Sequence, residues 1–511
     1  MFGTKERLAK LLRSPRFLKA LFLMAIVVVI VLITFSGRSN DARDRGNPAD
    51  TIGLGWEGTK GNETTDPCFK CHESFGVLEN VLLDWQKSKH AQNNVSCVDC
   101  HEATASDPDA YEHNGYMISL VVSPRDCARC HDQEVQEFNS SLHAYGSIYY
   151  EYQFSMGDIP YLESQLEGGY ISVDEENITH AATIRGCQAC HGSNMIGKDT
   201  SDFTVWPNNG IGRINPDGSR GSCSACHSRH KFSVAEARHP ETCGQCHMGP
   251  DHPQIEMYME SKHGNIYSAE GSSWNWTEDD WKAGVDYRAP TCAGCHMSSA
   301  PGVPATHDVS SRLSWELETA LSRHTDNKAN AIGFNISDGS TWQEKRERMV
   351  AVCTQCHSYE WAANYYQQAD VVVELYNEKY KEAKATVDKL YEDGLLTKEM
   401  FDEPIEFKIY EMWHHEGRRA RMGAVMQAPD YVQWHGFYEL LKDKVEIEEM
   451  AEELRAKAED SGKEVQAPDN TPWYLLAAMA LILMLVSIGV VASRMGGRPP
   501  AQGERPPEPP T

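Results

Sequence analysis

The stretch Cys223-Ser-Ala-Cys226-His227-Ser-Arg-His230 decides how the chain is interpreted, because its Cys-x-x-Cys-His motif occurs eight times in the sequence. All 16 cysteines fall into these motifs, and each cysteine pair is followed directly by a histidine. No cysteine of the sequence is left for a disulfide, a zinc site or a thiol nucleophile. In chain order, the motifs consist of Cys68, Cys71 and His72; Cys97, Cys100 and His101; Cys127, Cys130 and His131; Cys187, Cys190 and His191; Cys223, Cys226 and His227; Cys243, Cys246 and His247; Cys292, Cys295 and His296; and Cys353, Cys356 and His357.

Each motif is the attachment signature of a c-type haem. Its two thiols add to the vinyl groups of the porphyrin, and its histidine becomes the proximal ligand of the iron. The sequence therefore predicts eight covalently bound c-type haems, and chance occurrence or zinc binding does not explain eight copies. So many haems must pack against one another and replace much of an ordinary apolar core. From the motifs alone, the simplest interpretation is an electron conduit.

The remaining histidines supply candidates for the distal ligands. The sequence has 21 histidines, which is enough for eight six-coordinate haems, so composition does not separate a conduit from an enzyme with an open haem. His90, His143 and His263 share a Ser-x-His pattern on stretches with helical character, and a helix folding back over a haem would deliver them to iron. His230 is too close to its own motif to reach the far side of that haem, so we expect it to serve a neighbour. The further candidates are His113, His307 and His414, with His180, His324, His415 and His435 as alternatives for the last place.

Composition and charge narrow the class of protein. The chain has 511 residues, of which 24% are charged and 41% hydrophobic, which excludes a disordered acidic tail and a protein built only of membrane spans. Its net charge of −26 argues against nucleic acid as a partner. Residues 1–36 carry +5 and residues 473–511 carry +1, so residues 37–472 carry −32. A protein that docks on this middle region is expected to present a basic patch.

Two apolar stretches predict an association with the membrane. Residues 17–35 are almost entirely apolar and follow five basic residues, which indicates an uncleaved signal anchor or, alternatively, a cleaved secretory signal. Residues 473–492 are long enough to cross a bilayer, and a buried core helix is the alternative. Basic flanks place both termini in the cytoplasm. We therefore expect a protein of the cytoplasmic membrane with its haem region on the periplasmic side, where c-type haems are attached.

The rest of the pattern predicts a mostly α fold. Residues 371–395, 401–423 and 437–457 have helical periodicity, and Pro404 lies near the expected start of the second of these helices. We expect a haem-packed N-terminal region followed by a bundle of long helices, flanked by transmembrane helices. The predicted segments are a basic end with an anchor (1–36), an octahaem region (37–358), a long-helix bundle for oligomerisation (359–460), a linker (461–472), a transmembrane helix (473–492) and a Pro-rich tail (493–511).

Several runs outside the motifs resemble the octahaem hydroxylamine oxidoreductase family. The resemblance covers roughly residues 60–445 and is specific in combination. The runs are Asn208-Asn-Gly-Ile-Gly-Arg-Ile-Asn-Pro-Asp-Gly218, Cys223 to His230, Cys243-Gly-Gln-Cys-His-Met-Gly-Pro-Asp-His-Pro-Gln254, Glu260-Ser-Lys-His-Gly264, Thr306-His-Asp-Val309, Trp413-His-His-Glu-Gly-Arg-Arg419 and Pro429-Asp-Tyr-Val-Gln-Trp-His-Gly436.

The resemblance implies a catalytic site. In that family, seven haems are six-coordinate and transfer electrons, while the haem on the fourth motif has an open distal side; its proximal ligand here would be His191. An Asp–His pair stands over the catalytic haem and corresponds to Asp251 and His252. A tyrosine from a neighbouring subunit of a trimer is covalently linked to that haem in the oxidative members, and Tyr431 is the best match. The plainer alternatives are a turn carrying a ligand for another haem at Asp251–His252, and an ordinary packed residue at Tyr431.

These features together predict oxidation of hydroxylamine to nitric oxide or nitrite, with seven further haems passing electrons to a cytochrome c or to a membrane protein that reduces quinone. An open ferric haem binds the nitrogen, and a nearby histidine accepts protons. Hydrazine oxidation is a related possibility. A reductive octahaem enzyme acting on nitrite or hydroxylamine, and a non-catalytic conduit, are the rival classes. The sequence has no Cys-x-x-Cys-Lys motif, which argues against the pentahaem type of nitrite reductase.

Overall fold

The structure is a computed structural model that describes residues 66–76, 78–148, 186–196, 208–326, 336, 338–398 and 401–460. Both predicted membrane spans, residues 17–35 and 473–492, lie outside these ranges, as does His180. Within the described ranges, no helix combines the length and the apolar character that a membrane span requires.

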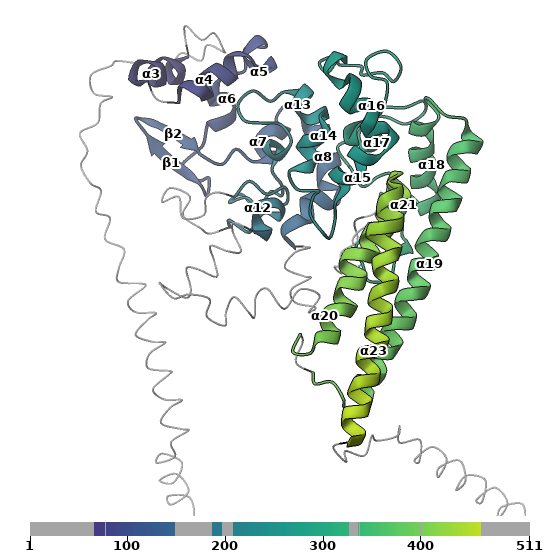
Figure 1. Cartoon of the computed structure of the whole chain (residues 1–511). Helices are drawn as coiled ribbons and strands as arrows, with labels where there is room; N and C mark the ends of the chain where they lie inside the picture. Colours follow the sequence, from purple (N-terminus) through teal and green to yellow (C-terminus); the bar gives the residue numbers. More distant parts are fainter. Residues whose placement is uncertain are drawn as a thin grey trace, which may run out of the picture. The chain divides into compact units, whose positions relative to one another are not determined.

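Contacts along the chain separate two units. The first unit contains residues 1–56 and His113–Tyr116, of which the structure describes only the latter four residues. The second unit contains all other residues and carries the haem motifs and the long helices (Figure 1). The description below concerns the second unit unless stated otherwise.

The prediction of a mostly α fold is confirmed. Up to residue 300, short helices and turns alternate with irregular segments. The described elements there are α3 (Pro67–Phe75), α4 (Glu79–Gln86), α5 (Lys89–Gln92), α6 (Cys97–His101), β1 (Ala110–His113), β2 (Tyr116–Ser119), α7 (Pro124–Ala128), α8 (Asp132–Asn139), η2 (Leu142–Tyr145), α12 (Cys187–His191), η3 (Cys223–Ala225), α13 (Val234–Arg238), α14 (Pro240–Gly244), α15 (Gln254–Glu260), α16 (Lys262–Glu270), η4 (Gly271–Ser273) and α17 (Cys292–His296).

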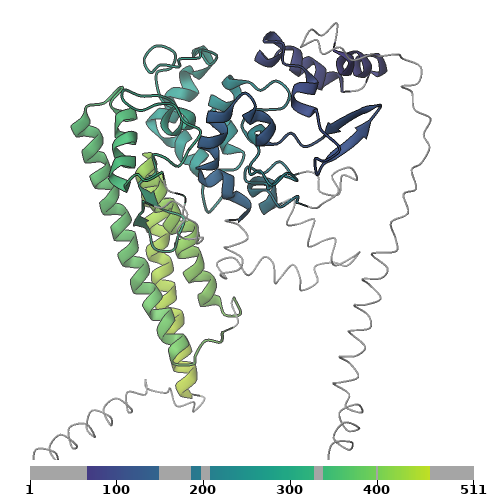
Figure 2. The ribbon, with the colours of Figure 1, turned by 180° about the vertical axis from the view of Figure 1, so that it is seen from behind.

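Longer helices follow and pack lengthwise (Figures 1 and 2). Strands β3 (Trp315–Glu316) and β4 (Arg323–His324) form a small antiparallel sheet before them. The helical elements are α18 (Trp342–Cys353), α19 (Tyr359–Glu392), α20 (Pro404–Glu411), the π-helical segment η6 (Met412–Gly417), α21 (Arg418–Met426), α22 (Pro429–Val432), a second π-helical segment η7 (Gln433–Tyr438) and α23 (Glu439–Asp460).

Helix α19 starts twelve residues before the predicted position 371. The Ser358 side chain accepts a hydrogen bond from the backbone N–H of Trp361 and so caps the first turn. The turns before residue 371 also pack inward, since Ala362 and Ala369 are buried and the Tyr365 hydroxyl donates to the Ala424 carbonyl of α21. Pro404 occupies the first turn of α20, where proline costs no hydrogen bond.

The largest buried apolar cluster of the described residues lies among α19, α20, η6 and α23. Its members include Tyr376, Leu390, Ile405, Leu440 and Ile447. The two other described clusters are small and lie in or beside the haem region; one of them joins Met257 of α15 to Met422 of α21. The long helices therefore have a protein core of their own, whereas the haem region offers little apolar side-chain volume.

Candidate haem sites and catalytic centre

One backbone turn gives each motif the shape that haem attachment needs. In the third, fifth, sixth and eighth motifs, the backbone N–H of the proximal histidine donates to the carbonyl of the first cysteine, at 2.8 to 3.0 Å. The second, fourth and seventh motifs are complete short helices, α6, α12 and α17. This turn brings both sulfurs and the imidazole to one side of the backbone, where a single macrocycle can meet them.

Side-chain caps start several of these turns. Asp66 accepts hydrogen bonds from the backbone of Cys68 and Phe69, at 2.8 and 3.0 Å. Ser96 and Ser123 each begin a capping box, with Asp99 and Asp126 respectively. The motifs are thus fixed locally by polar residues that precede the first cysteine, without the help of a large apolar core.

Five proximal histidines each face another imidazole. The pairs and their ring-centroid distances are His131 with His90 at 6.1 Å, His101 with His230 at 6.3 Å, His247 with His143 at 6.0 Å, His227 with His307 at 6.5 Å, and His357 with His263 at 6.2 Å. Two imidazoles on opposite sides of one iron, each with a metal–nitrogen bond of about 2 Å, place their centroids roughly 6 Å apart. The residues present therefore fit bis-histidine haems at the second, third, fifth, sixth and eighth motifs.

Helix starts position three of the five facing imidazoles. Ser88 caps α5 and Ser261 caps α16, through bonds from the backbone of Ala91 and Gly264. Ser141 precedes the turn η2, which carries His143. The Ser-x-His pattern therefore corresponds to a histidine held in the first turn of a short helix.

The other candidate ligands have different surroundings. His113 ends strand β1. The ring of His324 is stacked between Trp315 and Trp342, with centroids 3.7 Å from each. His435 forms an ion pair with Asp430 at 2.7 Å.

His414 and His415 lie on η6. The ring of His414 stacks on Tyr410 with centroids 4.6 Å apart and meets Trp413 edge-on. Its pKa is lowered to about 2, first by burial and then by the charge of Arg418. Among the imidazoles that the structure describes, neither of the two lies across a proximal histidine in the manner of the five pairs.

Close backbone packing holds the fourth motif in place. The backbone N–H groups of Ile211 and Gly212 donate to the carbonyls of Cys190 and His191, at 2.8 and 3.1 Å. A side chain at Gly212 would collide with the backbone of Gly146, so this approach requires glycine. Nδ1 of His191 lies 3.2 Å from the carbonyl of Gly146, which fixes the tautomer with Nε2 free for a metal.

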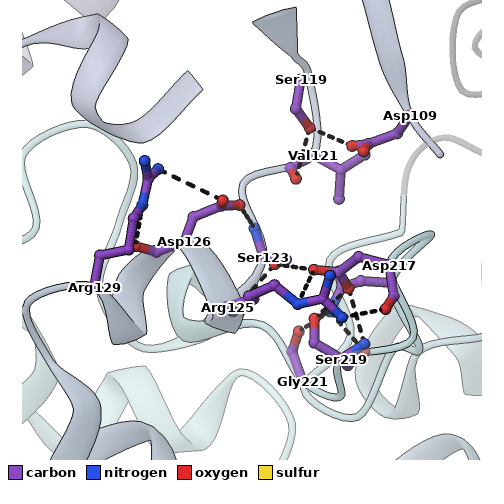
Figure 3. Close-up of polar contacts among 11 residues, drawn as sticks. Asp109, Ser119, Val121, Ser123, Arg125, Asp126, Arg129, Asp217, Ser219 and Gly221 are labelled. Carbon is purple, nitrogen blue, oxygen red and sulfur yellow. Dashed lines mark hydrogen bonds and ion pairs between the residues drawn. The ribbon is translucent and has the colours of Figure 1, made fainter. Parts of the chain in front are cut away.

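The run from residue 208 to 218 also braces the third motif, as Figure 3 shows. Asp217 accepts a hydrogen bond from the Ser123 hydroxyl at 2.7 Å, and its backbone carbonyl accepts one from Arg125 at 2.7 Å. Just before the third motif, the hydroxyl of Ser119 on strand β2 donates to the carboxylate of Asp109. A run that the sequence offered only as a family resemblance thus ties the third motif to the fourth.

Motifs that are distant in the sequence meet at their thiols. Cys190 of the fourth motif lies close enough to Cys246 of the sixth to influence its pKa. Likewise, Cys243 contacts Cys292 of the seventh motif. Cysteines mark the porphyrin edges, so haems attached at these three motifs adjoin one another in the order fourth, sixth, seventh.

Asp251 and His252 form the polar cluster beside the fourth motif. Nδ1 of His252 lies 2.7 Å from Oδ1 of Asp251. The other carboxylate oxygen of Asp251 lies 3.6 Å from the guanidinium of Arg418, which is itself buried and donates to the Glu318 carbonyl. The charge of His252 influences the pKa values of Cys190, His191 and His247, so the imidazole lies near both the fourth and the sixth motifs. Its ring also lies 6.2 Å from that of His247.

The cluster stabilises charge on both members of the pair. Burial opposes ionisation of Asp251, but the hydrogen bond to His252 and the neighbouring positive charges outweigh burial and hold the pKa of Asp251 well below its ordinary value. Burial likewise disfavours a charged His252, but its bond to Asp251 and the charge of that carboxylate raise the pKa of His252 above its ordinary value. The sequence analysis did not assign Arg418 a role; its only signal was its place in the run from Trp413 to Arg419.

Tyr431 lies on α22, half-buried against the cluster of Met257, Met422 and Ala428. Its ring stacks on His435 with centroids 5.1 Å apart. Burial raises the pKa of its hydroxyl. A link from this tyrosine to the haem of another subunit needs a second copy of the chain, so its surroundings within one chain do not test that link.

Comparison with known protein families and curated sequences places these features among multihaem cytochromes. The family described as "Seven times multi-haem cytochrome CxxCH" matches residues 216–404. A protein of Kuenenia stuttgartiensis named "Probable nitrite reductase-hydroxylamine oxidoreductase fusion protein" is 32% identical over 198 residues, which cover 34% of this chain. The match spans only 23% of the length of that relative.

Two solved structures are similar over most of the chain. A "Hypothetical multiheme protein" superposes with a TM-score of 0.64 at 27% identity, covering 78% of this chain and 97% of its own. A reducing HAO-like protein complex of Kuenenia stuttgartiensis superposes with a TM-score of 0.54 at 23% identity, covering 77% of this chain and 86% of its own, which indicates a shared fold. With its repeated attachment motifs and facing imidazoles, the chain is similar to multihaem c-type cytochromes, and its motifs are those by which such proteins bind haem covalently.

Proposed function

We propose that this cytochrome oxidises hydroxylamine to nitric oxide or nitrite at the haem attached to Cys187, Cys190 and His191. The observation that carries the proposal is the pair of Asp251 and His252, fixed by Arg418 and placed beside the fourth motif. A conduit needs no polar cluster of this kind next to a haem, whereas a reaction that removes several protons does. We further propose that all eight motifs carry haem.

Asp251 and His252 have separate tasks in this scheme. The haem supplies Lewis acidity and accepts electrons when it is bound. His252 donates Nδ1–H to Asp251, which leaves Nε2 as the atom that takes protons from substrate nitrogen or oxygen. Formation of nitric oxide removes three electrons and three protons, and formation of nitrite consumes one water and removes four electrons and five protons. Asp251 stabilises the imidazolium after each transfer, and Arg418 keeps the carboxylate ionised and in place.

The remaining haems would carry the electrons away. Contact of Cys190 with Cys246, and of Cys243 with Cys292, gives a route of adjoining haems from the fourth motif through the sixth to the seventh. We propose that the electrons leave to a basic cytochrome c or to a quinone-reducing membrane protein, because the region carries −32. The apolar segments 17–35 and 473–492 would hold this region at the periplasmic side of the membrane.

An exposed apolar groove supports assembly into a homotrimer. It is lined by Val372 and Leu375 of α19, by Phe437 of η7, and by Leu441 and Val445 of α23. Leu375, Leu441 and Val445 are 42%, 45% and 52% exposed in the single chain. Exposed apolar side chains that gather in one groove are typical of an interaction surface.

The groove also reaches the residue that the resemblance assigns to the catalytic haem. Val432 and Gln433, which line it, directly follow Tyr431 in the chain. A copy docked there would bring Tyr431 close to the other subunit, as the proposed link between Tyr431 and the haem of the fourth motif requires.

Mass spectrometry of proteolytic peptides from the purified, haem-loaded protein tests the proposal. The expected result is a species that joins the Tyr431 peptide to the haem peptide of residues 187–191. An unlinked Tyr431 peptide, together with a haem peptide of ordinary mass, would contradict an oxidative enzyme of this type. A link from another tyrosine would keep the function and change only the assigned residue.

A reductive reaction is the second candidate, because the name of the relative that is 32% identical over 198 residues contains "nitrite reductase". Stopped-flow mixing separates the two directions. The oxidative proposal expects hydroxylamine to reduce the ferric haems in the absence of any other donor. Haem oxidation by nitrite in the pre-reduced protein, with no reduction by hydroxylamine, would favour the reductase.

A further inference from the structure

Three buried hydrogen-bond donors near the seventh motif have no partner in the protein. They are Nε1 of Trp281, the hydroxyl of Tyr287 and Nε of Arg312. The three residues are only 4%, 3% and 2% exposed. Water cannot reach such positions freely, and an unsatisfied buried donor costs about 1–3 kcal/mol. Three of them close together indicate a ligand that the protein chain does not provide.

The three donors belong to one neighbourhood. The rings of Trp281 and Tyr287 have centroids 4.1 Å apart. Tyr287 and Arg312 interact electrostatically, and both sense the charge of Cys295. One guanidinium nitrogen of Arg312 also donates to the Cys295 carbonyl at 2.7 Å. The group therefore lies against the seventh haem motif.

Arg312 is the donor of the three that carries a charge. Its terminal nitrogens donate to the carbonyls of Cys295, Ser298 and Pro304, which carry no charge. Within the ranges that the structure describes, no carboxylate forms an ion pair with this guanidinium. Arg312 thus combines a buried positive charge with an Nε donor that has no partner, and an anionic acceptor would satisfy both.

Arg421 shows what a purely structural buried arginine looks like in the same chain. It is fully buried, and its donors reach the carbonyls of Gly417, Thr319 and Trp413 and the hydroxyl of Ser322. Every nitrogen of that guanidinium has a partner. The free Nε of Arg312 is therefore informative, since burial of an arginine in this fold does not by itself leave a donor unsatisfied.

We propose that Trp281, Tyr287 and Arg312 bind a haem propionate at the junction of the seventh and eighth motifs. A propionate is the anionic group that a haem brings into a protein interior, and a carboxylate accepts several hydrogen bonds from such donors. Tyr287 senses the charges of both Cys295 and Cys356, which places it between the two motifs. Burial, the largest of several causes, raises the pKa of Tyr287 to about 12, so its hydroxyl stays protonated and can donate. The inference requires haem binding but does not depend on the proposed substrate.

The consequence is control of one haem potential. An ionised propionate that is paired with a guanidinium adds little net negative charge near the iron. Removing a donor leaves more of that charge uncompensated, which favours the ferric state and lowers the midpoint potential. It also brings protonation of the propionate into the accessible pH range, so that the potential becomes pH-dependent.

Redox titrations of the haem-loaded protein, followed by EPR and optical spectra, test this assignment with the variant Tyr287→Phe. The matched control is Tyr258→Phe, since Tyr258 is also buried but donates to the Pro290 carbonyl at 3.2 Å. We expect Y287F to lower one midpoint potential, to give it a pH dependence and to shift a propionate band in the infrared difference spectrum. Y258F should do none of these.

Arg312 supplies the second arm of the test. We expect Arg312→Met to lower the same midpoint potential further. Arg312→Lys keeps the charge, so its midpoint potential should lie between those of R312M and the parent protein. If R312M does not fold, Y287F and Trp281→Phe carry the test alone. Unchanged potentials and an unchanged infrared spectrum in the folded variants would overturn the assignment and leave the three donors a structural role only.

Discussion

Asp251 holds His252 by a hydrogen bond of 2.7 Å between Oδ1 and Nδ1. Because the carboxylate is in turn paired with the buried Arg418, its position does not depend on solvent or on a mobile side chain. The arrangement holds the imidazole in one orientation and stabilises its protonated form. A proton acceptor beside a haem that removes several electrons needs both properties.

Replacing Asp251 by Asn should move the pH profile of hydroxylamine oxidation. His252 accepts protons only when it is neutral, so activity rises as the pH passes upward through the pKa of His252. Asp251 raises that pKa, and an amide would no longer do so. The acidic limb of kcat/KM should therefore shift to lower pH, with a loss of maximal rate of roughly tenfold or more.

Asp279→Asn is a suitable control for this experiment, because Asp279 is exposed and pairs only with Lys89 at 3.4 Å. The pH profile of kcat/KM for D279N should match that of the parent protein. An acidic limb that stays in place, or moves to higher pH, in D251N would show that His252 is not the group whose titration limits the reaction.

Removing a facing imidazole should open one haem. His307 lies across His227, and we expect His307→Ala to convert one haem from the low-spin to the high-spin state. Added imidazole should restore the low-spin signal, since it can occupy the vacated position. EPR and optical spectra of the purified variant report both changes.

His239 provides the matched control, because its ring stacks on Trp276, with centroids 3.9 Å apart, and contacts Tyr267. His239→Ala should leave the number of low-spin haems unchanged. A parent-like spectrum for H307A would remove His307 from the set of distal ligands, and a loss of low-spin haem in H239A would add His239 to it.

Local signals in the sequence predict the parts of the site that are themselves local. The motifs and the Ser-x-His pattern identify His90, His143 and His263 because a serine cap and one helical turn suffice to position them. The partner of each histidine is a matter of tertiary structure: His143 faces His247, which lies more than a hundred residues further along the chain. No periodicity or spacing contains that information.

Features that depend on tertiary contacts could not be predicted from the sequence. Arg312 differs from Arg421 only in the partners that the fold brings to it, so nothing in either neighbourhood of the sequence separates a ligand-binding arginine from a structural one. The start of α19 at Tyr359 was missed although Ala362 and Ala369 continue the buried spacing, because alanines give a weaker apolar signal than the valines and leucines after residue 371.

Gly212→Ala should destabilise the protein at the fourth motif. The new methyl group would collide with the backbone of Gly146, and neither segment can move without disturbing the hydrogen bonds to Cys190 and His191. We expect the free energy of unfolding to fall by about 1–3 kcal/mol, together with a changed spectrum of the fourth haem. Chemical denaturation followed by haem absorbance measures the first effect.

Gly302 offers a comparison, because a methyl group there meets open space and costs only the strain of a positive φ. Gly302→Ala should leave the haem spectra unchanged. Equal losses of stability in the two variants, with the fourth haem unaffected in both, would show that the contact of Gly212 with Gly146 does not position this motif.

The groove between α19 and α23 gives the last prediction. A charge at its centre should prevent a second copy from docking, because burying an unpaired carboxylate in an apolar interface costs more than such a contact supplies. We expect Leu375→Glu to convert the proposed trimer to monomers in light scattering and to abolish the proposed link between Tyr431 and the fourth haem. Val285→Glu is the control, since Val285 is 78% exposed and does not line the groove. A monomeric L375E protein that keeps the link would place the tyrosine donor within the same chain, whereas a trimeric L375E protein would move the interface away from this groove.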